Sequence, residues 1–250
     1  GCYDGFENMD IPQVTCLLNP ALGREKECEI IPVTKPETVL IAGGGIAGLE
    51  AAITLKRRGH NPILMESTDT LGGQFILAGK APRKKEMSDA VIRMGKQAQK
   101  MGIDIRLNTP VTPETISEIK PHSFINAIGA TPIQLNIPGN DLDFVYNSHE
   151  VLAGDKEVKG NVVVIGGGLV GCEVAEYAAA RGCKVTILEM LPAIASDLGS
   201  VRKTCVMESI YGAGIVPVTD IKVKAIEDGK VIGIKDNQEM SFDCDYAIVS

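Results

Sequence analysis

The chain has 250 residues, of which 44% are hydrophobic and 23% charged, and this composition excludes a largely disordered protein. Its net charge of -7 without a long basic block argues against a nucleic-acid or anionic-membrane surface. No apolar run reaches the ~20 residues that a membrane span needs, and the seven scattered cysteines do not resemble a secreted disulfide framework, so we expect a cytoplasmic protein. The length allows two domains of ~100–150 residues.

The first twenty residues, GCYDGFENMDIPQVTCLLNP, form a polar, turn-rich stretch that contains Cys2 and Cys16. The pattern alone leaves three interpretations open: a disulfide, a metal site, or two unrelated core thiols. Because the chain starts at a glycine and not at a methionine, we expect it to be part of a longer protein.

An internal repeat dominates the rest of the sequence. Residues 39–67 and 162–190 align without a gap, 123 positions apart, with the same residue at 10 of 29 positions. Each copy predicts a buried parallel strand, a helix that ends at Gly59 or Gly182, and a second strand that ends in an acid. In the first copy we expect a strand over 39–42 and a helix over about 49–58. In the second copy we expect a strand over 162–165 and a helix over about 172–181. A right-handed crossover makes each copy the start of a parallel sheet.

Further elements are expected between and after the copies. A core-facing helix is predicted by apolar residues at helical spacing, namely Met87, Val91, Met94, Ala98 and Met101. Further strands are expected at 103–107 and 123–128, a loop-rich boundary at 129–143, a helix near 200–211, and an antiparallel meander from the alternating runs 221–227, 230–235 and 239–249.

Each copy contains the pattern Gly-x-Gly-x-x-Gly, which is typical of dinucleotide-binding turns. Its glycines are Gly43, Gly45 and Gly48 in the first copy and Gly166, Gly168 and Gly171 in the second. The first glycine permits a tight turn, the second lets the backbone approach a pyrophosphate, and the third lets the helix lie close to the sheet. The N-terminal amides of the helix can then hold the anion.

An acid follows each first glycine by 23 residues, Glu66 in the first copy and Glu189 in the second. A carboxylate at the tip of that strand can accept hydrogen bonds from ribose hydroxyls. Two dinucleotides in one chain suggest a flavin and a nicotinamide that exchange a hydride. Since Met190 and Leu191 follow Glu189 and no arginine stands nearby to meet a 2'-phosphate, NADH is favoured over NADPH if the second site holds the nicotinamide.

The two units, joined by INAIGATP at 125–132, resemble the flavoprotein disulfide reductase superfamily, in which an NAD(P)H domain is inserted into an FAD domain. The redox-active cysteine pair of that superfamily is absent, so a disulfide reductase is disfavoured. Two stretches, TCLLNPALGREKE at 15–27 and TLGGQFILAGKAP at 70–82, resemble the iron-sulfur NADH:flavin oxidoreductases of the Old Yellow Enzyme-like family. This family includes 2,4-dienoyl-CoA reductases, enoate reductases and trimethylamine dehydrogenase-like enzymes.

The resemblance implies a set of cofactor ligands. FAD would be bound by Gly43, Gly45, Ile46, Ala47, Gly48, Glu66, Gly72, Gly73, Gln74, Ala127 and Gly129, and NADH by Gly166, Gly168, Leu169, Val170, Gly171 and Glu189. Cys2 and Cys16 would be the third and fourth cysteines of a 4Fe-4S cluster. No catalytic residue is assigned by the resemblance.

The expected fold is α/β, with two Rossmann-like three-layer domains, an NAD domain inserted into an FAD domain, and an antiparallel meander in the second. The expected divisions are an iron-sulfur segment and linker over 1–35, an incomplete FAD-binding domain over 36–135, and an NAD(P)H-binding domain over 136–250. The resemblance implies hydride transfer from NADH to FAD, then electron transfer through the cluster to FMN in an N-terminal TIM barrel that reduces an activated alkene. The expected partners are this barrel and a small-molecule substrate, with neither nucleic acid nor membrane and with a homo-oligomer left open.

Two other functions remain as alternatives: an NADPH-oxidising protein like the small subunit of glutamate synthase, and a dinucleotide-binding or redox-sensing protein without turnover. Among the remaining residues, four cysteines are expected to be small buried hydrophobes, namely Cys172, Cys183, Cys205 and Cys244. Glu173 and Glu176 follow the second glycine motif. An exposed helix charge is the expectation for both, with an approach of Glu173 to the nicotinamide as an alternative.

Overall fold

The computed structural model describes residues 14–132 and 135–250. The chain divides between Pro132 and Ile133 into two compact units, and the described residues 14–23 group with the later one. We call Arg24–Pro132 the first unit and the part from residue 135 to Ser250 the second unit. Within the described ranges, no helix combines the length and the apolar character that crossing a membrane requires.

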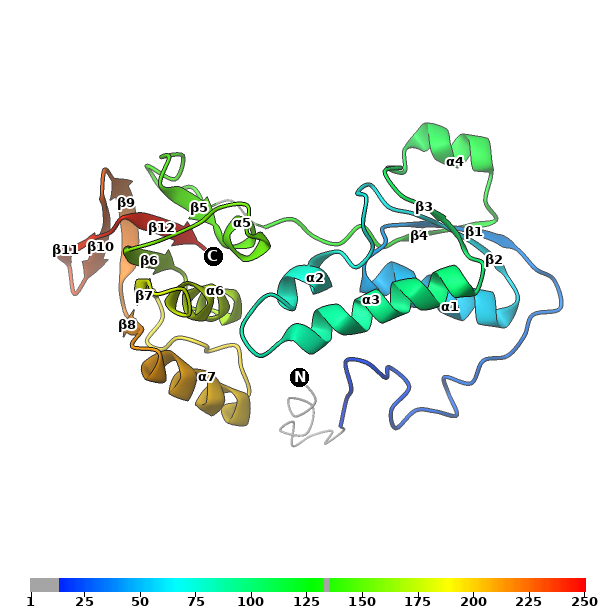
Figure 1. Ribbon diagram of the computed structural model, residues 1–250, viewed down its shortest axis with the longest axis horizontal. Coiled ribbons are helices and arrows are strands. Elements are labelled where there is room, and N and C mark those ends of the chain that lie inside the picture. Colours follow the sequence, from blue (N-terminus) through cyan, green and yellow to red (C-terminus); the bar gives the residue numbers. More distant parts are fainter. Residues whose placement is uncertain (1–13, 133–134) are drawn as a thin grey trace. The chain divides into compact units, whose positions relative to one another are not determined.

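The first unit is built on a four-stranded parallel sheet with the strand order β3-β2-β1-β4. Figure 1 shows α1 and α3 on one face of this sheet and α4 on the other. The elements are β1 (Thr38–Ala42), α1 (Ile46–Arg58), β2 (Asn61–Met65), α2 (Gln74–Ala78), α3 (Lys85–Lys100), β3 (Asp104–Arg106), α4 (Pro113–Ile119) and β4 (Ser123–Asn126).

The core of the first unit lies between the sheet and the helices α1 and α3. Ile41 and Leu64 from the strands are fully buried with Leu49 of α1. The methionine-rich face of α3 packs into the same core, since Val91 and Ala98 are buried and the methionines beside them are partly buried. The prediction that this face belongs to the core is confirmed.

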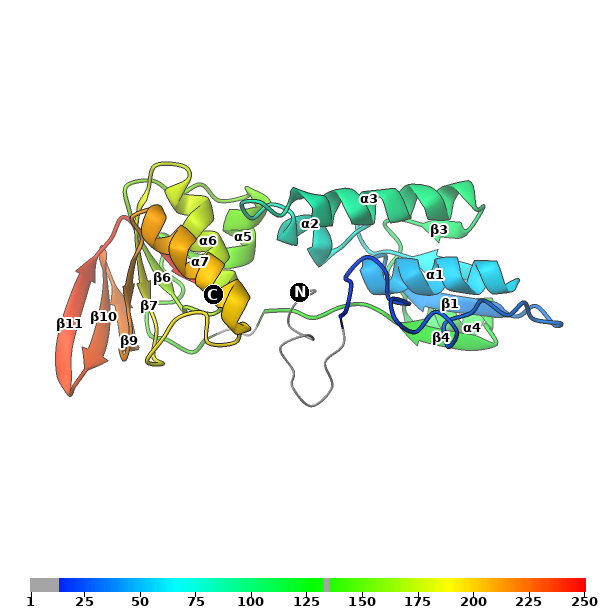
Figure 2. The same ribbon diagram turned by 90° about the horizontal axis from the view of Figure 1, so that it is seen from below.

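The second unit combines a five-stranded parallel sheet, in the order β5-β12-β6-β7-β8, with a three-stranded antiparallel sheet, in the order β11-β10-β9. The two sheets and the helices α6 and α7 can be followed in Figures 1 and 2. The elements are β5 (Val145–Asn147), α5 (Ser148–Ala153), β6 (Asn161–Ile165), α6 (Leu169–Ala179), β7 (Lys184–Leu188), α7 (Ser200–Gly212), β8 (Val216–Val218), β9 (Lys222–Glu227), β10 (Lys230–Lys235), β11 (Gln238–Asp243) and β12 (Tyr246–Val249).

The continuous apolar run of β6 is explained by cores on both faces of its sheet. Val162 and Val164 belong to the core beneath the helices, whereas Val163 and Ile165 belong to the core beneath the antiparallel sheet. Because successive side chains of a strand point to opposite faces, a strand covered on both sides needs apolar residues throughout. The predicted three-layer α/β fold with an antiparallel sheet is confirmed.

The helices after the glycine turns begin three residues earlier than predicted. Both α1 and α6 start directly after the second glycine of their motif, which occupies the N-cap with an extended backbone. Glycine inside a helix normally counts against it, which is why the prediction began after the third glycine. At the other end Gly59 is the predicted left-handed C-cap with φ 94°, whereas α6 ends at Ala179 and Gly182 follows the helix with φ 87°.

The predicted strand over 239–249 is wrong as a single element of the meander. The run breaks after β11, and β12 pairs in parallel with β6 in the central sheet. The reason lies in the side chains, because Ala247, Ile248 and Val249 form an unbroken buried run. Such a run suits a strand with both faces covered, while the alternation of β11 suits a strand with one exposed face.

We predict that Ile248→Ala destabilises the second unit by about 2–5 kcal/mol, since it removes a fully buried side chain from the helix-covered core. The matched change Met240→Ala on β11, where the side chain is 40% exposed, should cost less than about 1 kcal/mol. Urea unfolding measures both variants. Equal small losses would contradict the place of β12 in the core.

Candidate dinucleotide-binding sites

The first glycine of each motif is fixed by the backbone that passes over it. Gly43 has φ 102°, and a Cβ there would lie 2.3 Å from the carbonyl oxygen of Ala127. Gly166 has φ 105°, and its Cβ would lie 2.6 Å from the carbonyl oxygen of Ser250. Only glycine fits these two positions, because each combines a left-handed backbone with a close backbone neighbour.

The third glycine of each motif has no room for a side chain, because it lies against the carbonyl of the first. A Cβ at Gly48 would lie 1.9 Å from the carbonyl oxygen of Gly43, and a Cβ at Gly171 would lie 2.0 Å from that of Gly166. The first turn of each helix therefore rests directly on the glycine turn before it. This contact brings the N-terminus of the helix to the carboxyl end of the first strand.

The second glycine is different, because none of the residues that the structure describes fills the space where its side chain would lie. Apart from the adjoining backbone, no atom of the described residues lies within 4 Å of a Cβ built on Gly45 or on Gly168, and both glycines have an ordinary negative φ. Neither helix has a side-chain hydrogen bond at its N-cap. The space beside these glycines and the uncapped amides that begin with Ile46 and Leu169 together suit a pyrophosphate.

The acid of the first copy is held by a dense set of hydrogen bonds. The N–H of Gly44 donates to Oε2 of Glu66 at 2.7 Å. Oε1 accepts from the N–H and hydroxyl of Thr68 at 2.8 and 2.9 Å and from the hydroxyl of Ser67 at 3.1 Å. Burial by itself raises the pKa of Glu66, but these donors outweigh burial and hold the pKa below its ordinary value. Glu66 is therefore charged at neutral pH.

The acid of the second copy has the same position but fewer partners. Glu189 is 8% exposed, as Glu66 is. Its Oε2 accepts from the N–H of Gly167 at 2.7 Å, and its Oε1 accepts from the N–H of Leu191 at 2.8 Å. Each carboxylate thus lies beside its glycine turn, where the ribose of a bound dinucleotide can reach it.

The middle glycines Gly44 and Gly167 were missed as functional residues by the sequence pattern. Each donates its N–H to the acid, and a Cβ built on either glycine would lie 3.1 Å from the Cβ of that acid. A side chain there would press against the carboxylate residue. The signal was present in the sequence, since both motifs read Gly-Gly-Gly where the pattern requires only two of the three.

The LGGQ stretch of the first unit lies against the first glycine turn. The N–H of Gly72 donates to the carbonyl of Gly44 at 2.9 Å, and a Cβ at Gly73 would lie 3.2 Å from the Cα of Gly45. The side-chain amide of Gln74 donates to the carbonyl of Ala130 at 2.5 Å. This bond joins the LGGQ stretch to the segment after β4, which also contains Ala127 and Gly129. The predicted FAD residues of the first unit therefore form one connected group.

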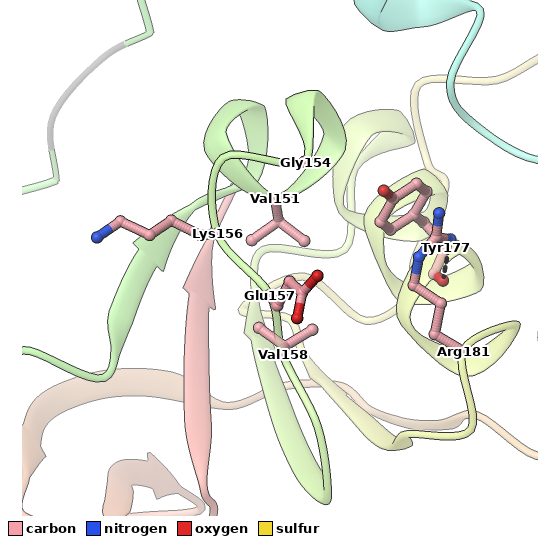
Figure 3. Close-up of a pocket in the computed structure, with 7 residues that line it drawn as sticks. All are labelled: Val151, Gly154, Lys156, Glu157, Val158, Tyr177 and Arg181. Carbon is pink, nitrogen blue, oxygen red and sulfur yellow. Dashed lines mark hydrogen bonds between the residues drawn. The ribbon is translucent and has the colours of Figure 1, made fainter.

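A pocket of about 350 Å³ lies elsewhere in the second unit (Figure 3). Its lining includes Val151 of α5 and Tyr177 of α6. The guanidinium carbon of Arg181 lies 3.4 Å from the centre of the Tyr177 ring, and Arg181 donates to the Tyr177 carbonyl at 3.2 Å. These residues are at the C-terminal end of α6, where the helix dipole disfavours an anion. The pocket is therefore separate from the pyrophosphate position at the opposite end of this helix.

The cysteines fall into exposed and buried groups. Cys16 is half-buried, and Cys2 lies outside the described residues. Within the described residues no group of three or more His, Cys, Asp or Glu is placed to hold a metal. Cys172, Cys183 and Cys244 are buried as predicted, but Cys205 is exposed, so that part of the prediction is wrong. Burial is the main cause that raises the pKa of Cys172 to about 12, and this thiol stays protonated.

Glu173 and Glu176 are buried, at 8% and 9% exposure, so the expectation of exposed helix charges is wrong. Glu176 accepts a hydrogen bond from the hydroxyl of Ser209 on α7. Helix α7, which the sequence did not place beside α6, thus contributes to the burial of Glu176.

A family model described as pyridine nucleotide-disulphide oxidoreductase matches residues 37–250. The chain belongs to this family. Membership supports a flavin oxidoreductase module that binds FAD and NAD(P)H.

Several curated proteins are similar to the chain. It is 34% identical over 250 residues to a bilirubin reductase of Mediterraneibacter gnavus. The aligned region covers 100% of the chain and 39% of that protein. It is 39% identical over 191 residues to a cinnamate reductase of Clostridium sporogenes. This aligned region covers 76% of the chain and 28% of that protein. The chain thus spans well under half the length of these relatives.

Among solved structures, 2-naphthoyl-CoA reductase has a TM-score of 0.93 at 28% identity, over 100% of the chain and 38% of that structure. The predicted resemblance to the NADH:flavin oxidoreductases of the Old Yellow Enzyme-like family is confirmed by these relatives.

The geometry predicts losses of stability of different size for the second and third glycines of one motif. Gly171→Ala should destabilise the second unit by at least about 2 kcal/mol, because the new methyl group meets the Gly166 carbonyl. Gly168→Ala should change the free energy of unfolding by no more than about 1 kcal/mol, because the space beside it is open. Urea unfolding without nucleotide compares the two variants. Equal losses would show that the second glycine serves packing alone.

Proposed function

We propose that the chain is the NADH:FAD module of a flavin oxidoreductase, with FAD in the first unit and NADH in the second. When both are bound, NADH supplies a hydride and FAD accepts it. The observation that carries the proposal is the pair of matching glycine turns, each with open space at its second glycine and a buried carboxylate beside it. The residues of the chain bind and orient the two cofactors.

The assignment of FAD to the first unit is supported by the LGGQ stretch. A flavin must stay bound through many turnovers, so its site benefits from a segment that holds it in place. Gln74 and Ala130 join the two segments on either side of the first turn. At the corresponding position of the second unit, 123 residues later, stands Asp197 in the stretch that leads to α7. The second site is thus the better candidate for a cofactor that exchanges at every turnover.

The preference for NADH over NADPH is supported by Glu189. The carboxylate is buried and accepts two backbone hydrogen bonds, so a 2'-phosphate placed beside it would meet a fixed negative charge. The next two residues, Met190 and Leu191, are 65% and 48% exposed and supply no cation. The side chains at this rim therefore suit a ribose with a free 2'-hydroxyl.

Anaerobic addition of NADH to the FAD-loaded full-length protein tests the proposal by the bleaching of the flavin absorbance. The wild type should bleach with NADH at concentrations at least tenfold below those needed with NADPH. Gly45→Ala should purify with less FAD, because its methyl group enters the space beside the first turn. Gly168→Ala should keep its FAD and bleach with dithionite, but need at least tenfold more NADH.

No bleaching of the wild type by either nucleotide would instead favour a binding or redox-sensing protein. Bleaching with NADPH at the lower concentration would favour an NADPH-oxidising protein like the small subunit of glutamate synthase. Loss of FAD from Gly168→Ala and not from Gly45→Ala would reverse the two cofactor assignments.

We further propose that Cys16 and Cys2 are two of four ligands to a 4Fe-4S cluster that connects this module to FMN in a barrel domain of the full-length protein. The reductases among the relatives support a small, activated alkene as the final acceptor. Cys16 is half-buried, which is compatible with a ligand that also meets another segment.

Replacing Cys16 with serine should remove the cluster, since serine is a poor ligand for iron in these sites. Iron content and visible absorbance of the intact protein measure the loss. The matched control is Cys28→Ser, an exposed cysteine twelve residues further on, which should leave both unchanged. A cluster that survives Cys16→Ser would return Cys16 to the disulfide or thiol interpretations.

A further inference from the structure

Ile194 and Ala195 lie against the second glycine turn as Leu71 and Gly72 lie against the first. The offset between the pairs is again 123 residues, although this stretch carries no recognisable sequence identity. The N–H of Ala195 donates to the carbonyl of Gly167 at 2.7 Å. In the first unit the equivalent bond to the Gly44 carbonyl is 2.9 Å.

The side chain of Ile194 also lies against Gly167. A Cβ at Gly167 would lie 2.5 Å from Cγ2 of Ile194, just as a Cβ at Gly44 would lie 2.6 Å from Cδ2 of Leu71. Ile194 is 2% exposed and belongs to the helix-covered core of the second unit. The turn is therefore packed against a side chain that is itself held by the core.

Ala195 has φ 52°, in the left-handed region that an alanine rarely adopts, and it is fully buried. Gly72, its counterpart, has φ 119°. A left-handed alanine persists only where its surroundings hold it. Here the short bond to the Gly167 carbonyl and the anchored Ile194 side chain provide that support.

We infer that Ile194 and Ala195 are positioning residues for the nicotinamide dinucleotide. They hold the carbonyl of Gly167, while Glu189 holds the N–H of the same residue. Together they fix the orientation of the peptide that precedes Gly168 and the first amides of α6. The inference rests on the proposed function, because it concerns the site to which NADH is assigned.

The positioning role predicts a selective loss of affinity when the packing is removed. Ile194→Ala should raise the dissociation constant of ADP-ribose at least fivefold, measured by calorimetry on the FAD-loaded full-length protein. ADP-ribose contains the pyrophosphate and the ribose that the turn would bind, but it has no ring to reduce. In NADH titrations the half-saturating concentration should rise by the same factor, while the limiting rate of bleaching changes less than twofold and the FAD content stays unchanged.

The matched control is Ile210→Ala. Ile210 is also a fully buried isoleucine of the same core, but it lies near the end of α7 that leads into the start of β8, whereas the glycine turn follows the carboxyl end of β6. It should lose comparable thermal stability and keep ADP-ribose affinity within twofold of the wild type. Equal losses of affinity in the two variants would overturn the inference.

A compensating pair separates positioning from general destabilisation. Gly167→Ala alone should weaken ADP-ribose binding, because its methyl group meets Ile194. Adding Ile194→Ala removes the colliding methyl, so the double variant should bind more tightly than Gly167→Ala. A double variant that binds more weakly than Gly167→Ala would overturn the inference.

The proposed function and this inference fail differently. If ADP-ribose binds and the variants behave as expected, but NADH never bleaches the flavin, the positioning role stands and the oxidoreductase proposal falls. If NADH bleaches the flavin and Ile194→Ala behaves like Ile210→Ala, the reverse holds. If ADP-ribose does not bind to the wild type, the inference is overturned.

Discussion

The two sites depend on one residue in each copy, the middle glycine of the turn. Gly44 and Gly167 each donate an N–H to a buried carboxylate at 2.7 Å, and their carbonyls accept a hydrogen bond from the N–H of Gly72 and Ala195, respectively. A hydrogen bond to a charged group contributes about 1.5–3 kcal/mol, and the buried acid would be costly without it. The acid therefore stabilises the turn, and the N–H of the turn makes the burial of the acid possible.

This constraint explains why the second glycine can remain open. The turn keeps its shape through contacts on its other members: the first glycine meets a backbone carbonyl, the third rests on the first, and the middle one is held on both sides. Among the described residues, none fills the side of Gly45 or Gly168 where a Cβ would lie. A preorganised turn with one unfilled side loses little freedom when a phosphate arrives, and such preorganisation improves affinity without new contacts.

Features that need a particular residue type could be predicted from the sequence, because both copies keep that residue. Features that need only a backbone group in the right place could not. The glycines and acids were visible because only certain residue types satisfy their positions. The equivalence of Ile194–Ala195 with Leu71–Gly72 was hidden, because a backbone N–H can be supplied by almost any residue. Likewise, the pairing of β12 with β6 could not be separated from the meander, since alternation and continuous burial differ by only a few residues over such short runs.

The two copies agree beyond the predicted repeat and then diverge where their cofactors would make different demands. The pairing of Ser123 with Val39 recurs as Tyr246 with Val162, again 123 residues later, so β4 of the first unit is equivalent to β12 of the second. Divergence begins after the supporting residue: Gly73 and Gln74 continue into α2 and a bond to Ala130, whereas Ser196 turns its hydroxyl to the carbonyl of Ala193. A retained cofactor and an exchanged one can share the same turn, because the turn sets where the pyrophosphate binds. In the proposed assignment, the segment after the turn is what distinguishes the site of the retained FAD from that of the exchanged NADH.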